Sequence, residues 1–250
     1  MNNKSSSHYF LISLIIAQWA NRYYFQNPNW EYFLKPSVMF FMTYFLHIWT
    51  YNKSTYIGNI MFGFIFSLLG DVFLMFDNMF LLGLISFAFA HIFYILAFIN
   101  QAFGNEDKIK KEKEYKEHKV IKMSLYNKIF TLLISLGLYF CGYLFFNYLS
   151  NHLPDTMYFP VMIYCILIVT MIVSSIYRYT KTTNLSYYLT LAGGIIFACS
   201  DSLLSLTLFV DFKSKEASLM VMVTYYVAQY LIFLGTLEQY NYNISKISVS

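Results

Sequence analysis

The sequence predicts an all-α fold, a polytopic membrane bundle of eight transmembrane helices. Of its 250 residues, 58% are hydrophobic and only 12% are charged, whereas soluble globular domains carry about 25% charged residues. The apolar residues gather in eight segments, most of which reach the roughly 20 residues that a helix needs to cross a hydrocarbon core of about 30 Å. Because most connections are short, consecutive helices are expected to pack antiparallel in a single transmembrane domain over residues 1–250.

The segments differ in how well they meet this length. They run over residues 9–25, 36–51, 56–76, 79–100, 126–149, 157–179, 187–210 and 217–238. The first two are weaker, because Asn21 and Arg22 interrupt the first and the second is short. We expect Pro36 in the first turn of the second helix, where its missing N–H removes no hydrogen bond. The charged run at about 104–125 is expected to form a cytosolic loop or short surface helix between the halves.

Lysine and arginine predict the orientation of the chain. Most of the 17 fall in connections on the side of the N-terminus, and the opposite side carries Arg22, Lys35, Lys213 and Lys215. The positive-inside rule therefore places both termini in the cytosol, in the endoplasmic reticulum of a eukaryote or the inner membrane of a bacterium. The net charge of +4 is not gathered on a polar domain, so no nucleic-acid partner is expected.

The two halves of the chain have a similar outline. Four apolar segments precede the charged run and four follow it, and the third segment of each half contains an aspartate, Asp71 or Asp201. His91 in the fourth segment lines up with Gln229 in the eighth. Two copies with an even number of spans would share one orientation about an axis along the membrane normal. Both aspartates are then expected to face one central cavity at a similar depth.

Asp71 and Asp201 are the most informative residues. An isolated carboxylate at the centre of a spanning helix costs roughly 2.5–3.5 kcal/mol on insertion scales, and this chain carries two. Such acids are typical of catalysis or transport. The alternative is a structural polar contact between helices, such as an aspartate bonded to a serine one helical turn away; Ser67 lies one turn from Asp71, and Ser205 one turn from Asp201.

Further polar side chains lie at helical spacing in the same segments. They are His91 and Tyr94 in the fourth segment, Ser200 in the seventh, and Tyr225 and Gln229 in the eighth. Buried polar groups need partners, so these side chains are expected to converge on one another or on water. Taken singly, His91 is also typical of a packing residue, and intramembrane serines commonly join helices. Lys35, at the non-cytosolic boundary, is either an interfacial anchor or a partner of a lipid phosphate.

Several of these residues form motifs that resemble the YhhN-like lysoplasmalogenase family. The first half carries LGDVFL at 69–74, GLISF at 83–87 and AHIFY at 90–94, and the second half carries FACSDSLL at 197–204 and YYVAQYLI at 225–232. Lys35-Pro36 matches the start of the family's second helix. The resemblance covers most of the chain, from Lys35 to Ile232, with the motifs in the same order. The long lysine-rich connection departs from the family's more compact pattern.

The resemblance implies an eight-helix membrane hydrolase that cleaves the vinyl ether bond of lysoplasmalogens. The products are a fatty aldehyde and glycerophosphocholine or glycerophosphoethanolamine. Asp71 and Asp201 map onto the family's proposed catalytic pair. The partners it implies are a lysophospholipid substrate and membrane lipid, with no cofactor and no metal. The residues expected to position substrate or water are Lys35, His91, Tyr94, Ser200, Tyr225 and Gln229.

Two carboxyl groups suit this reaction. Protonation of the β-carbon of a vinyl ether creates an oxocarbenium ion, water adds to it, and the hemiacetal collapses to the aldehyde. The site therefore needs a proton donor and a negative group that stabilises the cation. Two acids in one cavity of low dielectric constant are expected to divide into one protonated and one ionised group. The sequence does not assign the two roles.

Other functions fit parts of the pattern. Two intramembrane acids in a duplicated bundle would also suit a proton-coupled transporter or a lipid translocator. A metal-dependent lipid hydrolase could use Asp71, His91, Asp201 and His47, but the sequence has no closely spaced ligand motif. No feature of the sequence directly indicates a membrane receptor. The three cysteines, Cys141, Cys165 and Cys199, lie in apolar segments without CxxC spacing and are expected to be small core residues.

Overall fold

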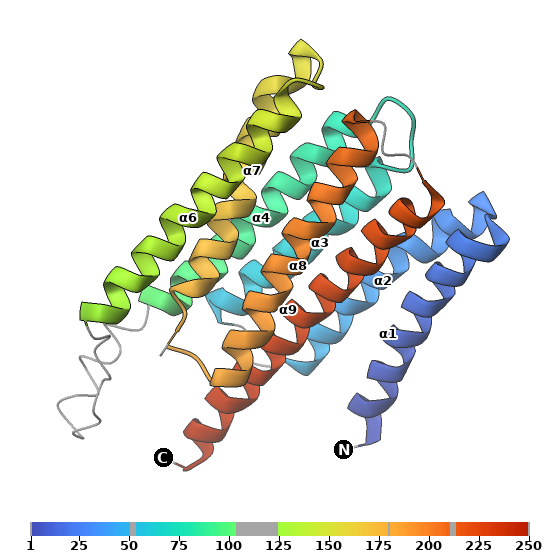
Figure 1. Ribbon diagram of the computed structural model, residues 1–250. Helices are drawn as coiled ribbons and strands as arrows, with labels where there is room; N and C mark the ends of the chain where they lie inside the picture. Colours follow the sequence, from blue (N-terminus) through green and yellow to red (C-terminus); the bar gives the residue numbers. More distant parts are fainter. Residues whose placement is uncertain (1, 51–53, 104–124, 180, 211–213, 250) are drawn as a thin grey trace.

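The computed structural model describes residues 2–50, 54–103, 125–179, 181–210 and 214–249 (Figure 1). Every regular element within these ranges is a helix, which confirms the predicted fold class. The helices are α1 (Asn2–Ala20), the π-helical turn η1 (Asn21–Phe25), α2 (Pro28–Trp49), α3 (Thr55–Phe73), α4 (Phe80–Phe103), α6 (Leu125–Ser150), α7 (Asp155–Ile176), α8 (Asn184–Phe209) and α9 (Lys215–Val249). They form one elongated bundle of roughly antiparallel neighbours. Residues 104–124, which hold the charged run, lie outside the described residues.

Capping residues determine where several helices begin. Asn27 caps α2 by accepting a hydrogen bond from the Asn29 backbone N–H at 3.0 Å, and Pro28 follows as the first helical residue. Such a start satisfies donors that have no partner within the helix. The expectation that the second helix begins at Pro36 was therefore wrong, and Pro36 lies inside α2. The first two turns of α2 are polar enough to escape a search for apolar segments.

The number of spans is supported in part. Six helices, α3, α4, α6, α7, α8 and α9, are long and apolar enough to cross a bilayer. This makes the chain an integral, multi-pass membrane protein. The two helices outside this set, α1 and α2, correspond to the two weaker apolar segments, and both begin with polar residues. That they also cross the bilayer, giving eight spans, stays a prediction.

Two helix pairs pack most closely, α3 with α4 and α8 with α9. Small residues allow this approach. A Cβ atom on Gly63 of α3 would collide with the Tyr94 ring of α4, and one on Gly193 of α8 would lie 2.9 Å from the Ala228 carbonyl oxygen of α9. The two pairs occupy equivalent places in the predicted four-helix repeat. The repeat itself stays a prediction.

The two ends of the chain lie at the same end of the bundle (Figure 1). This agrees with an even number of passes, and which side of the membrane holds them stays a prediction. Arg178, at the end of the bundle nearer the termini, is not a solvated loop charge. It is fully buried and donates hydrogen bonds to Gln101 of α4 at 2.8 Å and to Ser186 of α8 at 3.0 Å.

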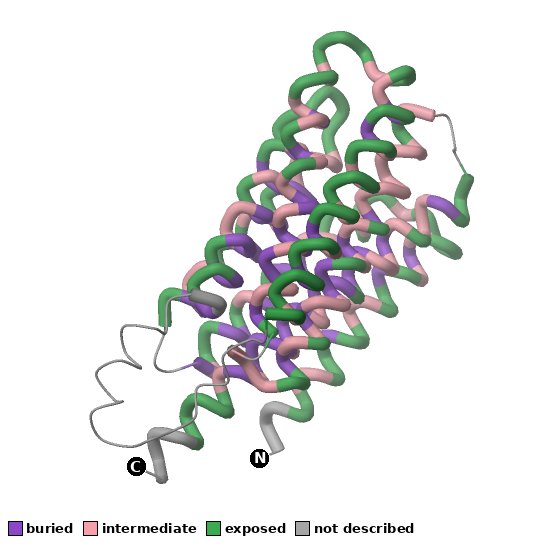
Figure 2. Tube along the Cα trace, turned by 60° about the vertical axis from the view of Figure 1, so that its left-hand side comes forward, coloured by how far each residue is buried: buried purple, intermediate pink, exposed green. Residues whose placement is uncertain are grey.

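Burial follows the pattern of a membrane bundle rather than that of a soluble core. Figure 2 shows buried residues along the inner faces of the helices and exposed residues along the outer faces. Among the six apolar spans, α6 is the least buried. Cys141 and Cys199 are exposed and Cys165 is partly buried. The expectation of three core cysteines was therefore wrong for these two, because apolar positions of a spanning helix can face lipid as well as protein.

Gly193→Ala is expected to lower the free energy of unfolding in detergent by about 1–3 kcal/mol, the range for overpacking. The new methyl group would lie 2.8 Å from Ile232 Cγ1 and 2.9 Å from the Ala228 carbonyl oxygen. Gly137→Ala in α6 is the control, because a Cβ atom there meets nothing within 4 Å, and it should stabilise the helix by up to about 1 kcal/mol. Equal unfolding curves for the two variants would contradict the close α8–α9 contact.

Candidate active site

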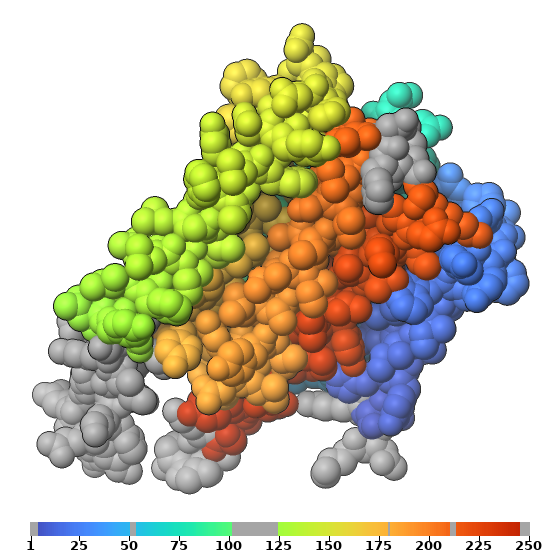
Figure 3. Space-filling model, in the orientation of Figure 1, coloured from blue at the N-terminus to red at the C-terminus, as the bar shows by residue number. Residues whose placement is uncertain are grey.

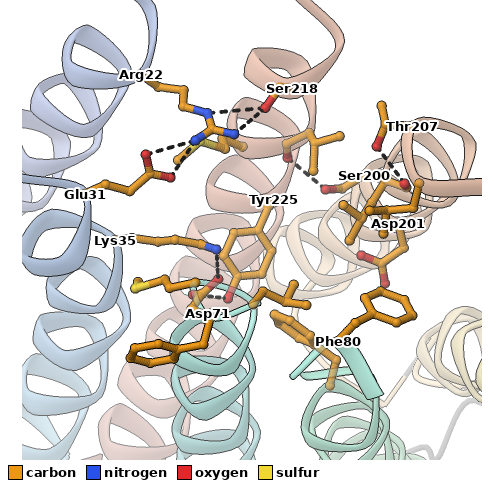
Figure 4. Close-up of a pocket in the computed structure, with 18 of the residues that line it drawn as sticks. Arg22, Glu31, Lys35, Asp71, Phe80, Ser200, Asp201, Thr207, Ser218 and Tyr225 are labelled. Carbon is orange, nitrogen blue, oxygen red and sulfur yellow. Dashed lines mark hydrogen bonds and ion pairs between the residues drawn. The ribbon is translucent and has the colours of Figure 1, made fainter. Parts of the chain in front are cut away.

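A cavity of about 830 Å³ opens at the end of the bundle opposite the chain termini. Its wall is formed by η1, α2, α3, α4, α8 and α9, with contributions from the connections between them. Figure 4 shows the side chains that surround it. The cavity is within the usual size range of small-molecule sites, about 300–1,000 Å³. Both Asp71 and Asp201 line it.

Asp71 has a partner on each carboxylate oxygen. The Tyr225 hydroxyl of α9 donates a hydrogen bond to Oδ2 at 2.8 Å, and Lys35 Nζ of α2 lies 3.8 Å from Oδ1 (Figure 4). Only 3% of the Asp71 side chain is exposed. The Tyr225 ring is itself held edge-on against Phe87 and Phe197. Helices α2, α3 and α9 therefore meet at this one carboxyl group.

Asp201 has a different set of partners. The Tyr164 hydroxyl of α7 donates to Oδ2 at 2.5 Å, and His91 Nε2 of α4 lies 3.4 Å from the same oxygen. His91 Nε2 is also 3.0 Å from the Tyr164 hydroxyl. His91 is fully buried, whereas 15% of the Asp201 side chain is exposed. Asp201 is thus the more accessible of the two acids.

The two aspartates are not at matching positions along their helices. Asp71 lies two residues before the end of α3, whereas Asp201 lies eight residues before the end of α8. The expectation that both sit at the centre of a spanning helix was wrong for Asp71. Within the described chain no hydrogen bond joins the two carboxyl groups. Each acid is instead placed in the cavity wall by its own neighbours.

The serines one turn away do not bind the acids. Ser67 accepts a hydrogen bond from Gln229 Nε2 at 3.0 Å, and Ser205 donates to the Ser202 carbonyl oxygen at 2.8 Å. The aspartate–serine form of the structural alternative is therefore not what the structure has. Its wider form, a polar contact between helices, describes the hydrogen bonds from Tyr225 to Asp71 and from Tyr164 to Asp201.

Some predicted site residues lie behind the cavity wall rather than in it. Tyr94 donates a hydrogen bond to Gln229 Oε1 at 2.7 Å, and both side chains are fully buried. Neither these two residues nor His91 line the cavity. Tyr94 and Gln229 are joined by a hydrogen bond, and His91 lies 3.4 Å from Asp201, so these polar side chains converge on one another as expected. That His91, Tyr94 and Gln229 position substrate or water stays a prediction.

The remaining predicted residues line the cavity. Lys35, Ser200 and Tyr225 all contribute to its wall. The Ser200 hydroxyl donates to the Val221 carbonyl oxygen of α9 at 2.8 Å, so it joins α8 to α9. Lys35 is not the first residue of its helix but lies in the second turn of α2, which lets its ammonium reach into the cavity towards Asp71 (Figure 4).

The sequence analysis missed an ion pair at the mouth of the cavity and the tyrosine beside Asp201. Arg22 makes two hydrogen bonds to Glu31, at 2.8 and 2.9 Å, and also bonds Ser218 of α9. The signal for this pair was Arg22 itself, a charge that interrupts an apolar segment. Tyr164 had no comparable signal, because this chain contains 24 tyrosines and most serve in packing or at interfaces.

The four residues proposed for a metal site do not converge. His47 is exposed in the last turn of α2 and does not line the cavity. In the described ranges no three His, Cys, Asp or Glu side chains are arranged to hold a metal ion. The chemistry that the site offers is therefore that of two carboxyl groups with unlike partners, one beside an ammonium and one beside a phenol and an imidazole.

Comparison with known proteins extends the resemblance seen in the motifs. The model of the YhhN family matches residues 30–236, a range that runs from α2 into α9 and includes both aspartates. Searches of curated proteins and of solved structures find no match. The family match covers most of the 250 residues. The chain therefore belongs to the YhhN family.

Proposed function

We propose that this protein hydrolyses the vinyl ether bond of lysoplasmalogens, releasing a fatty aldehyde and glycerophosphocholine or glycerophosphoethanolamine. The observation that carries the proposal is that two carboxyl groups from α3 and α8 line one cavity of a YhhN-family membrane protein while keeping unlike partners. A cationic transition state between two such acids is the arrangement that acid-catalysed ether cleavage needs. The reaction uses water and requires no cofactor.

The contacts of the two acids suggest how the roles divide. Both Asp71 oxygens have a partner, and one partner is the Lys35 ammonium. The ammonium favours the ionised form while burial opposes it, and an ionised Asp71 would stabilise the oxocarbenium ion. For Asp201 the partners within the described chain are on Oδ2, so Oδ1 can carry a proton towards the cavity. Asp201 is therefore our candidate for the proton donor.

The proposed steps balance without another reactant. The Asp201 carboxyl group transfers its proton to the β-carbon of the vinyl ether, and the electron pair of the double bond forms the new C–H bond. Water then adds to the oxocarbenium carbon and gives up a proton to the Asp201 carboxylate, which restores the acid. The hemiacetal collapses by breaking its bond to the glycerol oxygen, which takes up the hydroxyl proton.

The cavity mouth lies at the end of the bundle away from the termini. With both termini in the cytosol, as the charge distribution predicts, the headgroup would approach from the non-cytosolic side. A proton-coupled transporter or lipid translocator would return the lipid unchanged, whereas the proposed enzyme releases aldehyde in detergent, where no gradient exists.

Asp71→Asn and Asp201→Asn are each expected to lower kcat for aldehyde release from lysoplasmenylethanolamine by about 10²–10⁴-fold, the usual contribution of a positioned acid or base. The control is Asp155→Asn, which changes an exposed residue in the first turn of α7 that does not line the cavity. Wild-type turnover by either cavity variant would contradict the proposal. So would wild-type protein that releases no aldehyde from either the choline or the ethanolamine lipid.

Small carboxylic acids are expected to restore activity to Asp201→Ala but not to Asp71→Ala. Rescue of a proton donor requires the protonated form of the added acid, whose concentration falls as pH rises, so the rescued rate should fall with increasing pH. Rescue of a stabilising carboxylate would require the anion and would show the opposite dependence. The measurement is the aldehyde release rate against formate concentration at several pH values. Rescue of Asp71→Ala by the protonated acid would reverse the assigned roles.

A further inference from the structure

A second cavity, of about 290 Å³, lies beside the first and is bounded by α4, α6, α7 and α8. Its wall is apolar over most of its extent, with side chains such as Leu84, Leu138, Phe145 and Ile168. Among the described residues that line it, Asp201 carries the sole carboxyl group. The acid therefore lies at the edge of an apolar space as well as in the wall of the polar cavity.

The two cavities share part of their walls. The residues common to both are Leu74, Phe80, Phe87, Asp201, Leu204 and Leu208. The far side of the first cavity carries Arg22, Glu31 and Lys35. A path from the mouth of the first cavity into the second therefore passes from charged groups, past the Asp201 carboxyl group, to hydrocarbon.

This order matches one kind of molecule, a single-chain lipid with a charged headgroup. In a lysoplasmalogen the vinyl ether lies between the phosphate-bearing glycerol and the hydrocarbon chain. Positive and negative side chains at the cavity mouth complement a zwitterionic headgroup. The volume of the second cavity is close to the lower end of the usual range of about 300–1,000 Å³, which favours one chain over two.

The second cavity also reaches the outer surface of the bundle. Cys141 on α6 and Leu208 on α8 both line it and are both exposed. Helix α6 lies at the edge of the molecule beside α8 (Figure 3) and packs chiefly against α7, with little contact to α8. A hydrocarbon chain could therefore pass from the bilayer between α6 and α8 without leaving an apolar environment.

We infer that the cavity between α4, α6, α7 and α8 is the binding site for the hydrocarbon chain of the substrate, and that its depth selects chain length. The identity of the substrate rests on the proposed function. Binding there would place the first carbons of the chain beside Asp201 and the headgroup in the larger cavity. Cys165 lines the chain site and is partly buried, so a larger side chain at this position would reduce the space left for the chain.

Two cysteines make a matched test of chain selection. Cys165→Phe fills the chain site, whereas Cys199→Phe adds the same group at an exposed position on α8 that lines neither cavity. The ratio of aldehyde release rates from octenyl and octadecenyl lysoplasmenylethanolamine should shift towards the shorter chain by at least about tenfold in Cys165→Phe. Cys199→Phe should keep the wild-type ratio. A wild-type ratio in folded Cys165→Phe would overturn the chain site and leave the proposed reaction standing.

A binding measurement separates failure of the chain site from failure of the proposed function. Wild-type protein is irradiated with a lysophosphatidylethanolamine that carries a diazirine at the end of its chain, and the labelled peptides are identified by mass spectrometry. Label on the cavity-facing residues of α6 and α7, reduced in Cys165→Phe and retained in Cys199→Phe, supports the chain site even if no aldehyde is released. Label spread over the outward faces of the helices, unchanged in Cys165→Phe, overturns it.

Discussion

The burial of two carboxyl groups inside an apolar bundle is the constraint on which the rest of the structure depends. Removing such a group from water without a partner costs several kcal/mol, so each aspartate requires donors from neighbouring helices. Asp71 is contacted by Lys35 of α2 and Tyr225 of α9. Asp201 accepts a hydrogen bond from Tyr164 of α7 and has His91 of α4 close by. The contacts that satisfy the two acids are therefore also contacts that hold the helices together.

The partners of the two acids differ in chemical type, and this difference makes the two carboxyl groups unlike each other. An ammonium lies beside Asp71, whereas a phenol hydroxyl donates a hydrogen bond to Asp201 and an imidazole lies close to the same oxygen. Gln229, Tyr94 and Ser67 form a fully buried hydrogen-bonded set behind the cavity. Because these side chains satisfy one another, they hold α3, α4 and α9 in register. A rigid support of this kind is what a reaction with a short-lived cation requires.

The location of Asp201 at the boundary of two cavities of opposite character relates the fold to an amphiphilic ligand. A polar cavity alone would suit a soluble substrate, and an apolar one alone would suit a hydrocarbon. Asp201 lies in their shared wall, where the proposed lysoplasmalogen would change from headgroup to chain. Helix α6 has little contact with α8, which would let the proposed lipid reach the site from the bilayer rather than from water.

The sequence by itself determined the helical membrane fold, six of the predicted spans, the family and the convergence of the two aspartates on one cavity. It did so because hydrophobic length and an isolated intramembrane charge are local properties that need no knowledge of neighbours. The start of α2 at Pro28, the role of Tyr164 and the separate partners of the two acids were decided by tertiary structure. Helical spacing shows which residues share a face of one helix, but it carries no information about which helix that face meets. The second cavity was also decided by tertiary structure, because it lies where four helices do not fill the space between them.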